Sequence, residues 1–320
     1  MGLTYPGQVM SPPWGVDETK NIKGAKMALT NRYDFLFLFD VANGNPNGDP
    51  NFGNQPRQDT NGYGIVTDGC IKRKLRNYIV LQKDYAPGFN IFIKDGAVLN
   101  DAIGGAFEQP DIKKLDKKDT LRAAQNYLCK EFFDIRAFGA VLTTGEKDKQ
   151  AGWVCGPVQI TFSESFDTIQ PTEHCITRCA VTNIKDVEKE RTMGTKWTVD
   201  YALYMGQGFI NPKLADKTGF DEEDLQLTLQ GLMNMFEADR SAARGLMTTR
   251  KVIVFRHDSQ LGNASATELF ERLSVTHCEG VEEVLSFKDY KISFDDSDLP
   301  EGITVFEVGR QGNLIPLSSV

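Results

Sequence analysis

The sequence predicts an α+β fold of ferredoxin-like topology, and the order of its elements carries that prediction. Two long excursions interrupt the chain, and without them the apolar runs and helical stripes follow one another as strand, helix, strand, strand, helix, strand. The expected elements are 33–41, 68–80, 154–162, 201–205, 221–236 and 251–257. Domains that recognise RNA also use this topology, but topology alone assigns no function.

The first strand, 33–41, is expected at the centre of the sheet. Phe35, Phe37 and Phe39 share one face, and Leu36 and Leu38 make the opposite face apolar as well. A strand that is apolar on both faces is typical of the middle of a covered sheet. Exposed aromatic strand residues can stack on bases, but here a role in the core is favoured.

The next segment, 43–50, is expected to be a loop that neither continues the strand nor starts a helix. Pro46 and Pro50 lack the backbone donor, and Gly44 and Gly48 permit positive φ. The asparagines of this segment occupy positions of a calcium loop, but position 12 is Asn54 instead of glutamate, which disfavours calcium. Asparagine amides in such loops bind the backbone or are presented to a ligand.

A basic helix follows, with Asp68 as its expected N-cap. The helical period puts Ile71, Leu75, Tyr78 and Ile79 on one buried stripe. It also predicts that Lys72, Arg73 and Arg76 form one exposed arc, with Lys74 on the other flank. Cations without interleaved acids favour a phosphate contact, and a solvated helix face is the alternative.

Two excursions lie outside these elements. Residues 82–151 are expected to be an insertion that contains a hairpin around Asp95-Gly96 and a helix over 121–133. Residues 167–198 form a second excursion, and one of this length in a compact domain usually has its own function. A helix over 267–273 and strands over 291–294 and 303–308 are expected to complete the chain.

The charge of the chain is strongly segregated. The net charge is −8, but eight acids and two lysines between Glu279 and Glu301 account for −6 of it. The remaining chain carries only −2, and 68–83 has five cations against one acid. This separation suits a polyanion on the basic side, or copies of the chain packed head to tail.

Composition and terminal sequence predict a cytoplasmic protein without membrane spans. The six cysteines contain no CxxC pair, so reduced thiols are expected, and neither they nor the three histidines have the spacing of a zinc site. No metal or other cofactor is expected. Residues 1–30 have no periodicity and are interpreted as a flexible leader, an upstream start or added sequence.

Several motifs in one collinear order, over about residues 31–275, resemble the CRISPR-associated backbone subunit of type I-C Cascade, the Csd branch of the Cas-seven group in the RAMP superfamily. These motifs are Asn31-Arg32-Tyr33, 43–50, Pro56-Arg57, Val66-Thr67-Asp68, 72–77, Gly156-Pro157-Val158-Gln159, Ile176-Thr177-Arg178, 191–194 and 239–245. Gly69 departs from the family, in which a bulkier residue is expected.

The resemblance implies a hand-shaped protein with an RRM-like palm, inserted fingers and an extended thumb hairpin. The implied parts are a leader at 1–30, palm at 31–81, 152–166 and 199–278, fingers at 82–151, thumb at 167–198 and an acidic C-terminal segment at 279–320.

The implied function is that of a non-catalytic subunit that oligomerises along CRISPR RNA and presents it for pairing with target DNA. Other implied partners are copies of itself, the guide-processing, large and small subunits, and a recruited helicase-nuclease. The candidate RNA-binding residues are Asn45, Asn47, Arg57, Lys72, Arg73 and Arg76 in the palm, Arg178, Met193 and Lys196 in the thumb, and, more weakly, Arg240 and Arg244, which Asp239 and Glu237 are placed to pair locally.

Two alternatives stay open. One is an RNA-cleaving backbone subunit that uses a loop aspartate, with Asp49 as the candidate and Asp40 and Asp59 nearby. Scattered aspartates are also ordinary turn chemistry, and the chain has no Ser/His/Asp, Walker A or dinucleotide-binding signature. The other is a generic protein that binds single-stranded RNA.

Overall fold

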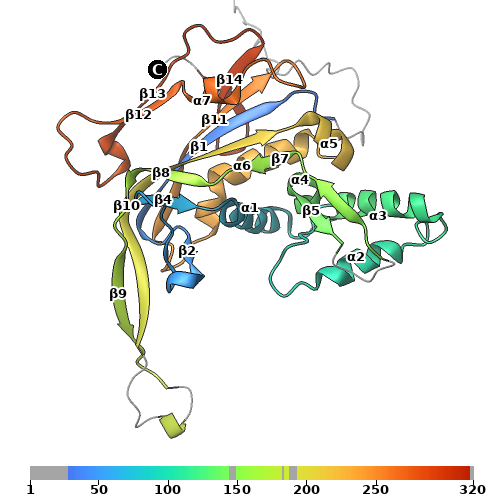
Figure 1. Ribbon diagram of the computed structural model, residues 1–320, viewed down its shortest axis with the longest axis horizontal. Coiled ribbons are helices and arrows are strands. Elements are labelled where there is room, and N and C mark those ends of the chain that lie inside the picture. Colours follow the sequence, from blue (N-terminus) through green and yellow to red (C-terminus); the bar gives the residue numbers. More distant parts are fainter. Residues whose placement is uncertain (1–27, 144–148, 182–183, 187–192, 318–320) are drawn as a thin grey trace, which may run out of the picture.

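A computed structural model describes residues 28–143, 149–181, 184–186 and 193–317. It shows a mixed α/β protein built on one large antiparallel sheet (Figure 1). The central path of this sheet runs in the order β15 (Leu314–Pro316), β14 (Ile303–Val308), β11 (Leu246–His257), β1 (Tyr33–Gly44), β10 (Met193–Ile210), β8 (Ser163–Thr168) and β4 (Tyr63–Val66). Two more strands, β7 (Val158–Ile160) and β9 (Thr172–Thr177), also pair with β10.

Strand β1 is central, as the sequence predicts, because β10 and β11 pair with its two edges. Phe35, Phe37 and Phe39 are fully buried in the main core, which confirms the core interpretation. Across the ladder, Gly206 and Gly208 lie under these rings, where an added Cβ would come within 2.2 Å of Phe37 and 2.1 Å of Phe35. Only glycine leaves room for the two rings on this face.

Helices α1 (Asp68–Lys83) and α6 (Glu222–Ala238) cover the face that carries Phe35, Phe37 and Phe39. The predicted stripe of α1 is confirmed, since all four of its apolar residues are buried. Asp68 is the first helical residue and not the cap. Thr67 precedes it in extended conformation and accepts a hydrogen bond from the Cys70 N–H, 3.3 Å away. Asp221 caps α6 as predicted.

The opposite face carries Leu36 and Leu38, and the C-terminal part of the chain covers it. The covering elements are α7 (Ala266–Phe270), β12 (Leu273–His277) and β13 (Tyr290–Phe294). Beyond them β14 and β15 extend the main sheet past β11. The acidic C-terminal segment is therefore partly integrated into the fold.

The insertion between α1 and β7 has a small core of its own. It contains α2 (Leu99–Phe107), α3 (Lys117–Glu131), α4 (Phe133–Phe138) and the paired strands β5 (Gly139–Leu142) and β6 (Gly152–Cys155). The predicted hairpin around Asp95-Gly96 is wrong: these residues form a turn without paired strands. The backbone N–H groups of Phe92 and Ile93 bind the Asp134 carboxylate, at 2.7 and 3.0 Å, instead of a neighbouring strand.

The single strand predicted over 154–162 is two strands, β6 and β7, separated by Gly156 and Pro157. Pro157 has no N–H for the ladder. Gly156 passes so close to the backbone of 137–139 that a Cβ would lie 2.3 Å from the Gly139 nitrogen.

The described residues of the excursion at 167–198 include a projecting two-stranded hairpin (Figure 1). Its arms are β9 and the first six residues of β10, which pair from Met193 with Thr177 to Thr198 with Thr172. The same strand β10 then continues into the main sheet. The 3₁₀ turn Ile184–Asp186 lies beyond the paired arms.

Short elements connect the larger ones. Strand β2 (Gly48–Asp49) pairs with β3 (Gln55–Pro56), and α5 (Pro212–Thr218) follows β10. Most of the predicted leader lies outside the described residues. Within the described ranges, no helix is long and apolar enough to cross a membrane.

Candidate nucleic-acid interface

The loop after β1 is held by its asparagine side chains. Asn45 is buried, and its amide nitrogen donates to the Asn54 carbonyl at 2.7 Å. The Asn47 Oδ1 accepts hydrogen bonds from the N–H and the hydroxyl of Thr67, at 2.9 and 3.0 Å. Both amides thus fix the loop, and Asn47 ties it to the start of α1.

The tip of this loop is a 3₁₀ turn, Pro50–Phe52, which Asp49 caps. One Asp49 oxygen accepts from the Asn51 N–H at 3.0 Å, and the other accepts from Arg57 at 2.8 Å. Arg57 is half-buried in this ion pair. The turn displays Phe52, which is 71% exposed.

A second loop, 239–245, lies directly beside the end of β1. The Asn45 N–H donates to the Ala243 carbonyl at 2.8 Å. A Cβ on Gly44 would lie 2.0 Å from the Arg244 carbonyl oxygen, so this approach requires glycine. The expected local pairing of this loop is confirmed: Arg244 lies 3.4 Å from Asp239, and Arg240 pairs with Glu237.

The two loops bring several charges together around one point. Burial raises the pKa of the Cys70 thiol, and the charges of Lys74, Arg244, Asp239 and Arg57 all act on it. Lys74, Arg57, Arg244 and Asp239 are therefore close enough to act on the start of α1, where Asp68 and Lys72 also pair. Arg57 and Arg244, which are far apart in the sequence, lie in one region.

The predicted exposed arc on α1 is wrong for Arg76. This residue is buried and donates to the Asp134 carboxylate at 2.7 Å, with its guanidinium 5.2 Å from the centre of the Phe138 ring. Lys74 is also buried, paired with Asp239. The helical period correctly predicted the apolar stripe of α1. It did not predict that α4 covers Arg76 on one flank of α1 and that the end of α6 covers Lys74 on the other.

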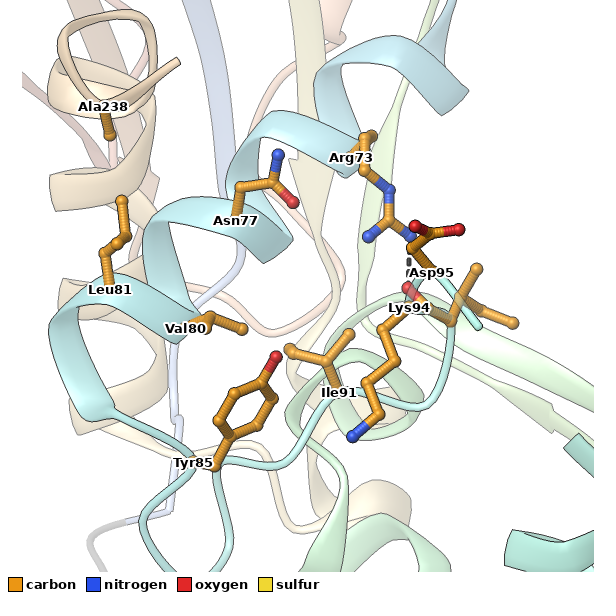
Figure 2. A pocket seen from close by; sticks show the side chains of 10 residues that line it. Arg73, Asn77, Val80, Leu81, Tyr85, Ile91, Lys94, Asp95 and Ala238 are labelled. Carbon is orange, nitrogen blue, oxygen red and sulfur yellow. Dashed lines mark hydrogen bonds between the residues drawn. The ribbon is translucent and has the colours of Figure 1, made fainter. Parts of the chain in front are cut away.

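Lys72 and Arg73 are the remaining arc residues. Lys72 pairs with Asp68 one turn earlier, at 2.9 Å, and lies over the Phe138 ring. Arg73 is half-buried and donates to the Ile93 carbonyl. Desolvation, followed by the nearby Arg76 charge, lowers the pKa of its guanidinium. Figure 2 shows Arg73 on the wall of a groove that α1 forms with the segment 85–95.

The hairpin carries the other candidates, Arg178, Met193 and Lys196. All three are exposed, and Met193 and Lys196 lie on the first four residues of β10. Every residue of β9 is exposed too. Figure 1 places the β2 loop beside the root of this hairpin, and β3 contacts β10 there. The hairpin and the two loops thus border one side of the sheet.

The aspartates near the first loop have structural partners. Asp40 is buried and binds Tyr201 at 2.9 Å and Arg250 at 2.7 Å. Asp59 accepts hydrogen bonds from the backbone of Asn61 and Tyr63 within its turn. In the described ranges, no three His, Cys, Asp or Glu side chains gather as ligands for a metal ion.

Sequence reasoning missed two features of this region. It placed Lys74 on a flank and did not find its buried pairing, because the partner Asp239 is 165 residues away in the chain. It also did not single out Tyr85 and Lys94, which line the groove beside α1. A signal for Tyr85 was available only in the structure, where its φ is +53°.

Comparison of the sequence with models of protein families shows to which family the chain belongs. The model of the family described as CRISPR-associated protein Cas7 matches residues 31–295, which is most of the chain. The chain belongs to this family. The family match covers the loop after β1, α1, the hairpin and the loop 239–245.

One curated relative is the CRISPR-associated protein Cas7 of Haloferax volcanii, which is 28% identical over 226 residues. The match covers 62% of this chain and 62% of that relative. The chain thus matches less than two thirds of the length of this relative.

The solved structures share less sequence identity with this chain than the curated relative does. Chains of two CRISPR RNA-guided surveillance complexes, one of them in a pre-nicking state, align with TM-scores of 0.44 and 0.40 at 10% and 12% identity. Each alignment covers 70% of this chain, and 78% and 68% of those chains. A chain of a Type III-B Cmr-beta complex bound to cognate target RNA aligns with a TM-score of 0.35 at 11% identity, over 70% of this chain and 61% of that chain.

Proposed function

We propose that this protein is a non-catalytic backbone subunit that binds CRISPR RNA and oligomerises along it in a type I-C Cascade. In this proposal the protein reads the RNA backbone and shape, while guide pairing with target DNA reads sequence. The observation that carries the proposal is the exposed β9–β10 hairpin, which projects from a sheet of a Cas7-family chain.

The order of the central strands supports an RRM-like palm. Around β1 the strands run β11, β1, β10, β8, with α1 and α6 on one face. In RNA-recognition domains the opposite sheet face stacks bases. Here α7, β12 and β13 cover that face, so RNA contact is assigned to the loops and the hairpin at the side of the sheet.

Two walls of a groove are proposed for the RNA. The palm wall consists of the loop after β1 and the loop 239–245, with Arg57 and Arg244 as its cations. The thumb wall is the hairpin, with Arg178, Met193 and Lys196 exposed. Arg57 and Arg244 each already have one carboxylate partner, but a guanidinium carries five N–H donors, so a phosphate oxygen can still bind.

The structural partners of Asp49 support the non-catalytic part of the proposal. Its two carboxylate oxygens cap the 3₁₀ turn and bind Arg57, which accounts for an aspartate at this position without catalysis.

Coexpression with CRISPR RNAs of increasing spacer length tests the proposal. A backbone subunit adds copies as the guide lengthens, so the protein mass of the purified complex should increase in steps of one 35.7 kDa chain, beyond the mass of the added nucleotides. A complex whose mass does not depend on guide length, or protein free of RNA, would contradict it.

A further inference from the structure

The groove beside α1 is built around a strained backbone. Asp84 and Tyr85, which follow α1, both have positive φ, +48° and +53°. Asp84 ends the helix in this conformation, which a short polar residue tolerates. At Tyr85, by contrast, the same conformation strains the backbone, because the residue is bulky and aromatic. Figure 2 shows that this backbone places the Tyr85 ring in the groove.

The groove has an apolar floor and a cationic rim. Its volume is about 730 Å³, and Val80, Leu81 and Ile91 contribute to its lining. Leu81 is 67% exposed. The exposed Lys94 extends its ammonium over the Tyr85 ring, 4.8 Å from the ring centre.

The charges on the rim total +1, from Arg73, Lys94 and Asp95. An exposed apolar floor with a cationic rim fits an acidic segment that carries an apolar side chain.

The chain itself contains such a segment, the loop between β12 and β13, here called the acidic loop (278–289). Glu282 and Glu283 are exposed, and among the described residues none forms an ion pair with either. Leu285 is 66% exposed. Asp289 accepts hydrogen bonds from the N–H groups of Leu285 and Ser286, at 2.9 and 2.8 Å, so a fixed turn displays this leucine.

One copy of the chain cannot bring its own acidic loop to its own groove. Val284, Phe287 and Tyr290 anchor the loop against Leu38 and Leu203, on one face of the sheet. Helix α1 packs on the other face, with Phe35, Phe37 and Phe39 (Figure 1). The groove and the acidic loop therefore lie on opposite sides of the sheet.

We infer that the groove of one copy binds the acidic loop of a second copy, with Leu285 against the apolar floor and Glu282 and Glu283 against the cationic rim. Because the two surfaces differ, the contact is heterologous and propagates head to tail. The inference rests on the oligomerisation in the proposed function and deepens it by naming protein surfaces through which copies meet, in a contact that itself requires no RNA.

Sedimentation velocity of the full-length, nuclease-treated protein tests this contact. Wild type should associate with increasing concentration, and salt should weaken the association. Lys94→Glu alone, and Glu282→Lys with Glu283→Lys, should each weaken association by about tenfold or more. Combining the three substitutions should restore it to within about threefold of wild type.

Two further variants control for charge and folding. Lys114→Glu makes the same charge change at an exposed lysine of the insertion and should leave association unchanged. Tyr85→Asn replaces the strained tyrosine with a residue that tolerates positive φ. The melting temperature of this variant should therefore equal or exceed that of wild type. Its association should nevertheless weaken by about tenfold, because the ring is lost from the groove.

A wild-type protein that stays monomeric at the highest concentration reached would overturn the inference. A triple variant that does not regain association would overturn it as well. Association that depends on Lys94 but not on the acidic loop would assign another occupant to the groove, and the inference would again be wrong. None of these results bears on binding of CRISPR RNA, which the coexpression experiment tests separately through the dependence of the complex mass on guide length.

Discussion

Replacing Arg76 tests whether the basic helix presents this cation to RNA or buries it. Arg76→Leu removes one partner of a buried ion pair and leaves Asp134, whose side chain is 1% exposed, without its cation. Loss of one partner typically costs about 3–5 kcal/mol of unfolding free energy. Asp134 keeps the N–H groups of Phe92 and Ile93, which places the expected loss near the lower limit, at about 3 kcal/mol.

Urea unfolding, monitored by circular dichroism, measures this loss of unfolding free energy as a lower midpoint urea concentration at an unchanged m value. Lys72→Gln is the matched control one turn earlier on the same helix, and its partly exposed pair with Asp68 should contribute only about 0.5 kcal/mol. In an Asp134→Asn background the cost of Arg76→Leu should decrease, because the stranded charge is gone. A loss under about 1 kcal/mol for Arg76→Leu would refute the buried pair.

Three further predictions concern charge. Burial, and to a lesser degree the Asp221 charge, raises the pKa of Glu222 from 4.5 to about 6. Between these two pH values the folded state binds a proton at Glu222 that the unfolded state has lost, so the unfolding free energy falls as the pH rises from 4.5 to 6. Glu222→Gln should therefore stabilise the protein by about 1 kcal/mol at pH 8, allowing for partial exposure, and not at all at pH 4, which urea titrations at both pH values measure. Lys196→Gln should reduce the slope of log K against log salt for single-stranded RNA by about 0.7, whereas Lys213→Gln, exposed on α5, should not change it. Asp49→Ala should cost about 1 kcal/mol through loss of the cap, and guide-complementary RNA with Mg²⁺ should stay intact with both proteins; cleavage that this variant abolishes would favour the RNA-cleaving alternative.

The sequence predicted the elements whose signal is local. The run 33–41, which is apolar on both faces, correctly identified a central strand, and the stripe through Ile71, Leu75 and Ile79 correctly identified the buried side of α1. Both patterns follow from the geometry of a single element. The cap Asp221 was found for the same reason, since an N-cap acts within its own first turn.

The cap of α1 was missed by one residue, since Thr67 and not Asp68 precedes the helix. Two other missed features depend on contacts between distant segments. Arg76 was predicted to be exposed because the helix was considered alone, and Asp134, 58 residues away, buries it. The predicted hairpin at Asp95-Gly96 was wrong because the Asp134 carboxylate binds the N–H groups of Phe92 and Ile93, which would have formed the ladder. Periodicity contains no information about either contact.

The candidate site was predicted in part. The loop after β1 and the loop 239–245 were both selected from the sequence, and the structure brings them together at Gly44 and Asn45. Asn45 and Asn47 were selected as amide contacts, and the structure uses both to hold the loop. Contact of any of these residues with RNA stays a prediction.

Nuclease footprinting of RNA that copurifies with the assembled protein tests the central claim most directly. Copies that each hold the same length of guide should protect it with one regular period, and replacing Lys196 should weaken protection at every repeat. Protection without a period, or no protection, would contradict a backbone subunit and favour a generic RNA-binding protein.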